Sequence, residues 1–331
     1  MRDEAPAPGV SRAGVRARVL ALSGAVLALL LAFGATLAYR GLIRYERRAI
    51  DHVPAGAELA VRVDLEQLVL FGPFREHLLA LVDHASLGWG AGSATGRLAR
   101  LREQGGLNLG LDLRELVVAR ARGGSWLLAF GGIFGQRSLL PGIEATLRAE
   151  PGAHVRREGA MLILEPSRFV LSQTEDGILL IGSDADIVQR ATPRTRVAAD
   201  LGLDTAGAAA AAAAPGWLEA LPWLDPTSPS LPLRGASARL DYGDPFAVRL
   251  ELGLDGVVDL AKARETIDAW FGAPVGAGFA PRADWGGERA VMARAELTSP
   301  EPGTLVLTSV WQRAELARAC RSLATWLEGK L

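Results

Sequence analysis

The chain of 331 residues contains a single cysteine, Cys320, so it has no pair with which to form an intramolecular disulfide. In the segment RAELARACRSLATWLEG, Cys320 shares a spacing of three to four residues with Leu316, Leu323 and Leu327. That spacing is typical of the apolar face of a helix. We therefore predict a buried structural thiol, because a reactive thiol needs an exposed and cationic setting.

Lysine is scarce as well, with Lys262 and Lys330 alone against 34 arginines. So strong an excess of arginine over lysine is typical of the codon bias of a GC-rich genome, and we do not take it as a sign of phosphate binding. Residues 1–50 hold eight of the 36 basic and three of the 37 acidic residues, which leaves 28 basic and 34 acidic residues after position 50. The net charge there, about −6, argues against nucleic acid as a partner, because phosphate contacts need clustered cations.

Motifs of catalysis and metal binding are missing. No G-x-S-x-G occurs, and the glycine-rich residues 88–96 have neither dinucleotide spacing nor the lysine of a phosphate loop. His77 and His84 are seven residues apart on one predicted helix, about 10 Å along its axis, which is too far to share one ion. His52 and His154 have no recognisable nucleophile partner. The sequence therefore predicts no catalytic residue, no metal site and no cofactor.

Two pairs of aspartates are the remaining catalytic candidates. Asp184 and Asp186 follow Ser183, which we predict to cap a short helix with both carboxylates in its first turn. Asp241 and Asp244 flank a predicted hairpin turn, where aspartate is common. Paired carboxylates do acid–base work only where their environments separate their pKa values. A carboxylate-dependent hydrolase is therefore the weakest of the functions considered.

One long apolar run is present at residues 19–39, closed by Arg18 and Arg40. At about 1.5 Å per residue it reaches roughly 30 Å, the thickness of a bilayer's hydrocarbon core. A cleaved signal peptide would have an apolar core of only about 7–15 residues and a small-x-small cleavage site. We therefore predict an uncleaved transmembrane helix that contacts the lipid bilayer.

The orientation of this helix follows from its short N-terminal side. Four arginines precede the span and four follow it closely, so the positive-inside count is balanced. A short tail ahead of a single span usually stays inside. We therefore expect residues 1–18 to be a cytoplasmic tail in a bacterial inner membrane, with the C-terminal domain periplasmic or otherwise extracytoplasmic.

Beyond a charged stem at residues 40–52, strand and helix patterns recur in two halves, 53–192 and 236–331. Each half reads strand–strand–helix twice, which indicates an internal duplication. Most strands alternate apolar and polar residues, as expected of a sheet with one covered face. The predicted fold class is therefore α+β, with antiparallel sheet or sheets and helices on one face. The strands are expected at 57–64, 114–121, 124–132, 154–158, 161–165, 168–174, 178–183, 236–242, 246–252, 288–297 and 304–311, and the main helices at 65–84, 137–149, 184–191, 257–271 and 313–329.

Residues 193–235 form an Ala/Pro-rich connector between the halves. Seven consecutive alanines at 208–214 predict a helix that ends at Pro215, because alanine is the best helix former. Trp217 and Trp223 follow in the proline-rich part. These indoles either cover the sheet or bind a partner, and tryptophan is enriched in interface hot spots.

The leading hypothesis is a non-enzymatic, single-pass envelope protein whose exported domain binds an envelope protein partner, with Trp217 and Trp223 or an exposed sheet edge as the contact surface. A domain that binds a lipid or another envelope molecule in an apolar cleft between the halves is the alternative.

Overall fold

The computed structural model describes residues 48–74, 76, 102–103, 105–107, 112–134, 138–149, 152–165, 168–191, 193, 197–203, 206–215, 231–243, 245–272, 291 and 294–328. The chain divides into two compact units, Met1–Glu46 and Arg47–Leu331, and every described residue belongs to the second. The predicted transmembrane helix at 19–39 lies outside the described residues. Among the residues that the structure describes, no helix is long and apolar enough to cross a membrane.

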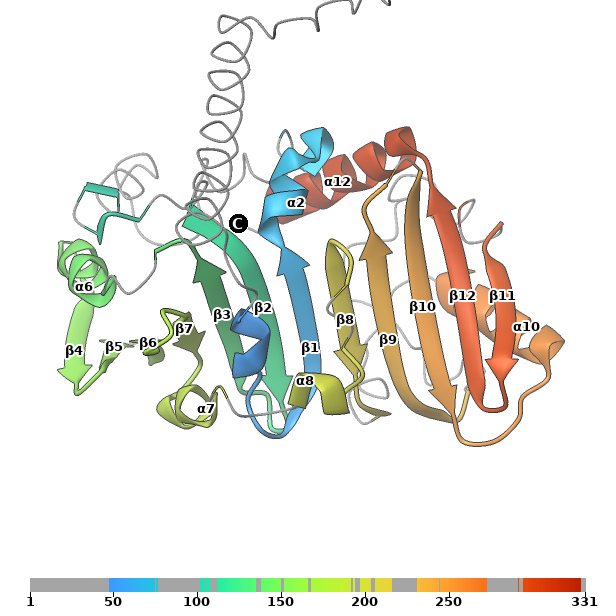
Figure 1. The fold of residues 1–331 in the computed structure, drawn as a ribbon, viewed down its shortest axis with the longest axis horizontal. Helices are drawn as coiled ribbons and strands as arrows, with labels where there is room; N and C mark the ends of the chain where they lie inside the picture. Colours follow the sequence, from blue (N-terminus) through green and yellow to red (C-terminus); the bar gives the residue numbers. More distant parts are fainter. Residues whose placement is uncertain are drawn as a thin grey trace, which may run out of the picture. The chain divides into compact units, whose positions relative to one another are not determined.

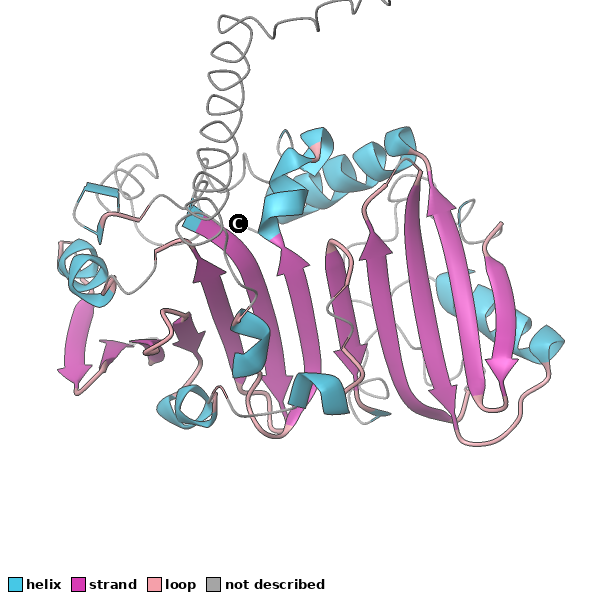
Figure 2. Ribbon diagram, in the orientation of Figure 1, coloured by secondary structure: helices cyan, strands magenta, loops and turns pink. Residues whose placement is uncertain are grey.

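Twelve strands form one antiparallel sheet (Figures 1 and 2) in the order β11-β12-β10-β9-β8-β1-β2-β3-β7-β6-β5-β4. The prediction of an α+β fold with antiparallel pairing is confirmed, and both halves share this sheet. The strands are β1 (Ala57–Asp64), β2 (Leu113–Ala121), β3 (Trp126–Gly132), β4 (His154–Glu158), β5 (Met161–Glu165), β6 (Phe169–Gln173), β7 (Leu179–Gly182), β8 (Ala209–Ala213), β9 (Leu233–Asp241), β10 (Phe246–Leu254), β11 (Glu296–Glu301) and β12 (Thr304–Trp311).

The alanine run is a strand, β8, and the prediction of a helix there is wrong. Its register places Val61 of β1 opposite Ala211, and Ala211 opposite Ala238 of β9. Helix propensity is worth less than 1 kcal/mol per residue, so a strand that hydrogen-bonds on both edges overrides it. The segment predicted as a connector thus supplies the strand that joins the two halves of the sheet.

β11 begins and ends later than predicted, and its later end is explained by a tight turn before β12. Glu301 pairs with Thr304, and Pro302 and Gly303 stand between them. Gly303 has a φ of +78°, the left-handed value that the third residue of a type II turn requires. The strand therefore covers Glu296–Glu301, whereas the sequence predicted 288–297.

Residues opposite one another on neighbouring strands share a face of the sheet, which defines the two faces. Face A carries the continuous row Leu162, Leu171, Ile181, Leu128, Val118, Val61, Ala211, Ala238, Leu250 and Leu307. Face B carries the residues between them, including Arg62 and Gly182.

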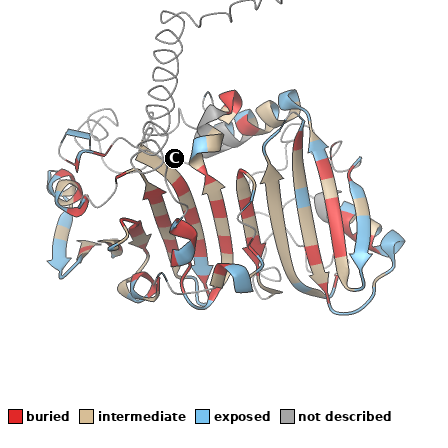
Figure 3. Cartoon of the chain, viewed as in Figure 1, coloured by how far each residue is buried: buried red, intermediate tan, exposed pale blue. Residues whose placement is uncertain are grey.

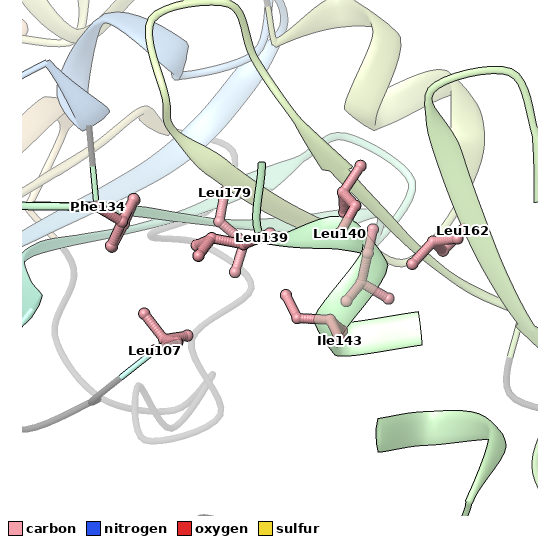
Figure 4. Packing of buried hydrophobic residues seen from close by; sticks show 8 residues of the cluster. Leu107, Phe134, Leu139, Leu140, Ile143, Leu162 and Leu179 are labelled. Carbon is pink, nitrogen blue, oxygen red and sulfur yellow. The ribbon is translucent and has the colours of Figure 1, made fainter. Parts of the chain in front are cut away.

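Helix α6 (Leu140–Arg148) packs on face A near one end of the sheet (Figure 4). Leu140 and Ile143, three residues apart, point to the same side of the helix. They form a buried cluster with Leu162, Leu171 and Leu179 of β5, β6 and β7. This apolar contact orders the β4–β7 part of the sheet.

Two longer helices cover face A of the second half. Ala263 and Ile267 of α10 (Leu260–Gly272) are buried against Leu252 of β10 and Leu305 of β12. Helix α12 (Arg313–Glu328) buries Cys320 in a cluster with Phe246 and Phe71. The second half thus has its described helices on one face, as predicted.

Face B of the first half is also covered, and here the prediction of helices on one face only is wrong. A Cβ on Gly182 would lie 2.6 Å from Val188 and 2.9 Å from Ile187, so α7 (Ala185–Arg190) packs directly on face B. The short helix η2 (Ala49–His52) contacts β2 and β3, and α8 (Val197–Asp200) contacts η2. Figure 3 shows the resulting bands of buried residues on β1, β2 and β3.

Candidate functional site

The chain enters the domain through η2, which is buried on face B. Ala49, His52 and Val53 have no exposed surface, and Ile50 is 6% exposed. Residues 49–52 fall within the predicted charged stem at 40–52, but they belong to the folded domain. The change from stem to domain therefore lies near Arg48.

An ion pair lies beneath η2 in the centre of the sheet. Arg62 Nε donates to Glu115 Oε1 at 2.8 Å, and the two side chains are 0% and 1% exposed. The other carboxylate oxygen of Glu115 accepts the backbone N–H of Ala49 at 3.1 Å. Asp64 lies 3.7 Å from Arg62 and caps helix α2 (Leu65–Leu70) by accepting the backbone N–H of Gln67.

The sequence reasoning missed this pair for a physical reason. In AELAVRVD the apolar residues Leu59, Val61 and Val63 alternate with Arg62, which therefore points to the face that was expected to be solvated. A second covering layer made that face interior. The usable signal was the opposite charge of Arg62 and Glu115 on two predicted strands that follow one another in the sequence.

A second buried polar contact holds the end of η2. His52 Nδ1 lies 3.0 Å from the carbonyl oxygen of Ala191, and Nε2 lies 3.0 Å from Oδ2 of Asp176. Thr174 Oγ1 donates to the other oxygen of Asp176 at 2.5 Å. The imidazole ring of His52 therefore ties the end of η2 to the β6–β7 turn and to the end of α7.

The same contacts affect the pKa of Asp176. Burial raises the pKa of the carboxyl, but the hydrogen bonds from Thr174 and His52 and the charge of His52 together hold it below its ordinary value of 3.8. Asp176 is thus ionised at neutral pH.

Asp184 and Asp186 serve helix α7, as predicted, although the cap is Asp184 rather than Ser183. Asp184 Oδ1 accepts the backbone N–H of Ile187 at 2.9 Å, and Ser183 donates its hydroxyl to Oδ2 at 2.8 Å. Burial raises the pKa of Asp184, but these hydrogen bonds and one from Ser125 lower it by more, so the pKa lies below its ordinary value of 3.8. Asp186 pairs with Arg190 one turn later. In the described part of the chain, there is no group of three or more histidine, cysteine, aspartate or glutamate side chains that could hold a metal ion.

A polar hollow of about 380 Å³ lies beside β9 and β10, lined by Gly202, Ser237, Ala238, Arg239, Arg249 and Glu251. Arg239 and Arg249 stand opposite one another in the register on face B. Each is neutralised along its own strand, Arg239 by Asp241 at 2.9 Å and Arg249 by Glu251 at 3.5 Å. The predicted candidate Asp241 is therefore a partner of Arg239, and Asp244 lies outside the described residues.

The predicted partner-binding residues Trp217 and Trp223 lie outside the described residues. His154 stands on edge strand β4, exposed to solvent. Cys320 is a free, buried thiol whose pKa is raised by burial, so the prediction of a structural thiol is confirmed.

Comparison with known proteins identifies the fold but no family. No family model and no curated protein matches the chain. Among solved structures, its α+β fold with one long antiparallel sheet resembles that of TP0453. Crystal form III of TP0453 has a TM-score of 0.50 and 11% identity over 84% of this chain and 99% of that one, and crystal form I has a TM-score of 0.46, also at 11% identity, over 85% and 98%. At this identity the likeness concerns the fold alone.

Proposed function

We propose that the protein is a single-pass, membrane-anchored binding or envelope-assembly protein without catalytic activity, held in the bacterial inner membrane by residues 19–39, with its domain outside the cytoplasm. The observation that carries the proposal is the position at which the domain begins. Among the described residues, the first that is fully buried is Ala49, and nine residues separate it from the predicted end of the span at Tyr39. Those nine residues extend at most about 30 Å. A domain tied so closely would work at the membrane surface.

The order of strands supports a duplicated ββαββα architecture. Outward from the central β1–β8 pair, the sheet reads β2-β3-β7-β6 on one side and β9-β10-β12-β11 on the other. In each half, strands two and three form a hairpin, a helix follows, and the last strand of the half returns to pair with the third. We infer that β4 and β5 are an additional hairpin at the outer edge of the first half.

The two edges of the sheet are poorly suited to bind a partner, and this favours Trp217 and Trp223 as the partner-binding residues. Edge strand β4 carries the charged sequence HVRRE, and its Arg157 pairs with Glu144 of α6. Edge strand β11 contains Pro300 and an irregular register. Charged side chains, proline and irregularity are the devices that keep an edge strand from pairing with another chain. We therefore propose that Trp217 and Trp223 contact the partner.

The other two functions receive less support. The hollow beside β9 and β10 is lined by charged and small residues, whereas a lipid site needs apolar walls. Asp184 and Asp186, the carboxylates proposed for a hydrolase, are engaged in capping and pairing within α7.

Gentle solubilisation and affinity purification of the full-length protein, with stoichiometry from mass spectrometry, test the proposal. We expect one envelope protein near a one-to-one ratio, and its loss in the variant W217A/W223A at unchanged thermal stability. Replacing Leu260, an exposed leucine on α10, by alanine is the matched control and should leave capture intact. A periplasmic reporter fused after Leu331 tests the orientation, and an inactive reporter there contradicts it.

A further inference from the structure

Face B of the sheet carries different kinds of residue in the two halves. In the first half, Ala119 of β2 and Leu127 of β3 stand opposite one another and are buried on strands that η2 contacts. In the second half, Arg239 of β9 and Arg249 of β10 stand opposite one another at the same distance from the central β1–β8 pair. Each pair lies one residue away from the row that defines face A. A covered apolar position in one half thus corresponds to two partly exposed guanidinium groups in the other.

The two arginines are held to different degrees. Arg239 donates from Nε and Nη2 to Oδ2 of Asp241, at 3.1 and 2.9 Å. Arg249 donates from Nη2 to Oε2 of Glu251 at 3.5 Å, and within the described part of the chain this is its one ion pair. That distance is longer than an ordinary hydrogen bond, and both side chains are about half exposed. The guanidinium of Arg249 is therefore loosely held, beside a like charge whose repulsion destabilises the sheet.

We propose that the hollow beside β9 and β10 binds a small soluble phosphate monoester of a sugar or another polyol, with Arg249 and Arg239 as the groups that bind the phosphate. Guanidinium groups recognise phosphate through paired N–H donors, and a phosphate between the two arginines removes their repulsion. Ser237 lies next to Arg239 on the same face, where its hydroxyl can donate to the phosphate as well.

Glu251 determines which phosphates fit. Its carboxylate lines the hollow and repels a bare anion, but it accepts hydrogen bonds from hydroxyl groups. A phosphorylated polyol can place its phosphate against the arginines and a hydroxyl against Glu251, so that it satisfies both charges. The lining thus favours a hydroxylated phosphate over inorganic phosphate.

The size and the lining of the hollow indicate a soluble ligand. Its volume of about 380 Å³ lies in the range of small-molecule sites. Gly202 and Ala238 are its only lining residues without a polar side chain, and neither is large enough to pack along an acyl chain. The phosphate is therefore expected on a soluble compound and not on a lipid.

Phosphorus-31 NMR titrations of the full-length protein in a phosphate-free detergent test the site. The probes are glycerol 3-phosphate and inorganic phosphate, at about pH 7.5 and low salt, where both are mostly dianions. The variants are R249Q and E251Q. The matched control is R122Q, which removes another exposed arginine that is paired with a glutamate.

We expect saturable binding of glycerol 3-phosphate to the wild type and to R122Q, and binding about tenfold weaker to R249Q, because a charge-assisted contact is lost. The wild type should bind glycerol 3-phosphate more tightly than inorganic phosphate. No saturable binding to the wild type, or equal binding to R249Q and the wild type, overturns the proposal.

E251Q gives a result of the opposite sign and decides the question if R249Q unfolds. Loss of the carboxylate should tighten the binding of inorganic phosphate several-fold and reduce the preference for glycerol 3-phosphate, because less repulsion remains. Unchanged or weaker binding of inorganic phosphate to E251Q overturns the proposal.

A short-chain lipid distinguishes the two sources of a phosphate monoester. Dihexanoyl phosphatidic acid should bind the wild type no more tightly than glycerol 3-phosphate, and a tenfold gain would overturn the assignment to a soluble compound. The site depends neither on the membrane anchor nor on Trp217 and Trp223. Failure of partner capture or of the periplasmic reporter would therefore refute the proposed function and leave this site standing.

Discussion

Arg62 and Glu115 face one another across β1 and β2, with 2.8 Å between Nε and Oε1 and almost no exposed surface on either side chain. Removing Glu115 takes away the carboxylate closest to the buried guanidinium of Arg62, which keeps only the longer contact of 3.7 Å with Asp64 among the ion pairs of the described residues. The variant E115A should therefore lose about 3–5 kcal/mol of unfolding free energy in a denaturant titration. The matched control is R122A, which removes the exposed partner of Glu58 and should cost less than about 1 kcal/mol. Equal losses in the two variants would contradict the burial of the central pair.

The pH dependence of stability should reveal Asp176. Because its pKa is lower in the folded protein than the ordinary value of 3.8, the ionised form stabilises the fold. This contribution is complete above pH 3.8 and is lost as the pH falls through the folded pKa. D176N should thus unfold at a lower temperature than the wild type at pH 7, and this difference in unfolding temperature should be smaller at about pH 3. If the difference in unfolding temperature between D176N and the wild type widened on acidification, the pKa of Asp176 would not be lowered by folding, and this prediction would be wrong.

The thiol of Cys320 should react slowly. Burial raises its pKa and restricts access, so a thiol reagent at about pH 8 should label the native protein at least tenfold more slowly than the unfolded protein. C320A should retain the fold with a modest loss of stability. Rapid labelling of the native state would show that α12 does not bury this residue.

Neighbouring alanines of β8 should respond in opposite ways to enlargement. Ala212 is 1% exposed on face B, so A212V should overpack and cost about 1–3 kcal/mol. Ala211 is only half-buried on face A, where a β-branched residue suits a strand, and A211V should be neutral or stabilising. The denaturant midpoints of A212V and A211V are compared with that of the wild type. Equal shifts in the two variants would argue that residues 209–213 do not form a strand.

Local sequence was sufficient to predict an element or a buried residue wherever nearby residues in the chain decide the outcome. β1 begins and ends as predicted from AELAVRVD, and the capping and pairing of Asp184 and Asp186 on α7 follow from their place in its first turn. The burial of Cys320 was equally local, because it needs only the spacing of leucines along one helix. The predicted partner-binding residues, Trp217 and Trp223, remain predictions.

The strand formed by the alanines, the buried Arg62–Glu115 ion pair and the His52–Asp176 contact all depended on contacts between distant segments. An alanine run forms a helix by its own preference, but here β1 and β9 offer it hydrogen bonds on both edges. Arg62 alternates with apolar residues as a solvated residue would, and the layer that covers face B removes it from water. His52 acquires its role from Asp176 in the same way. Strand and helix preferences along this chain were thus decided by the sequence itself, because they depend on neighbours within a few residues. Which face is buried, and which charges meet there, was decided by the tertiary structure, because desolvation depends on all the layers that cover a residue.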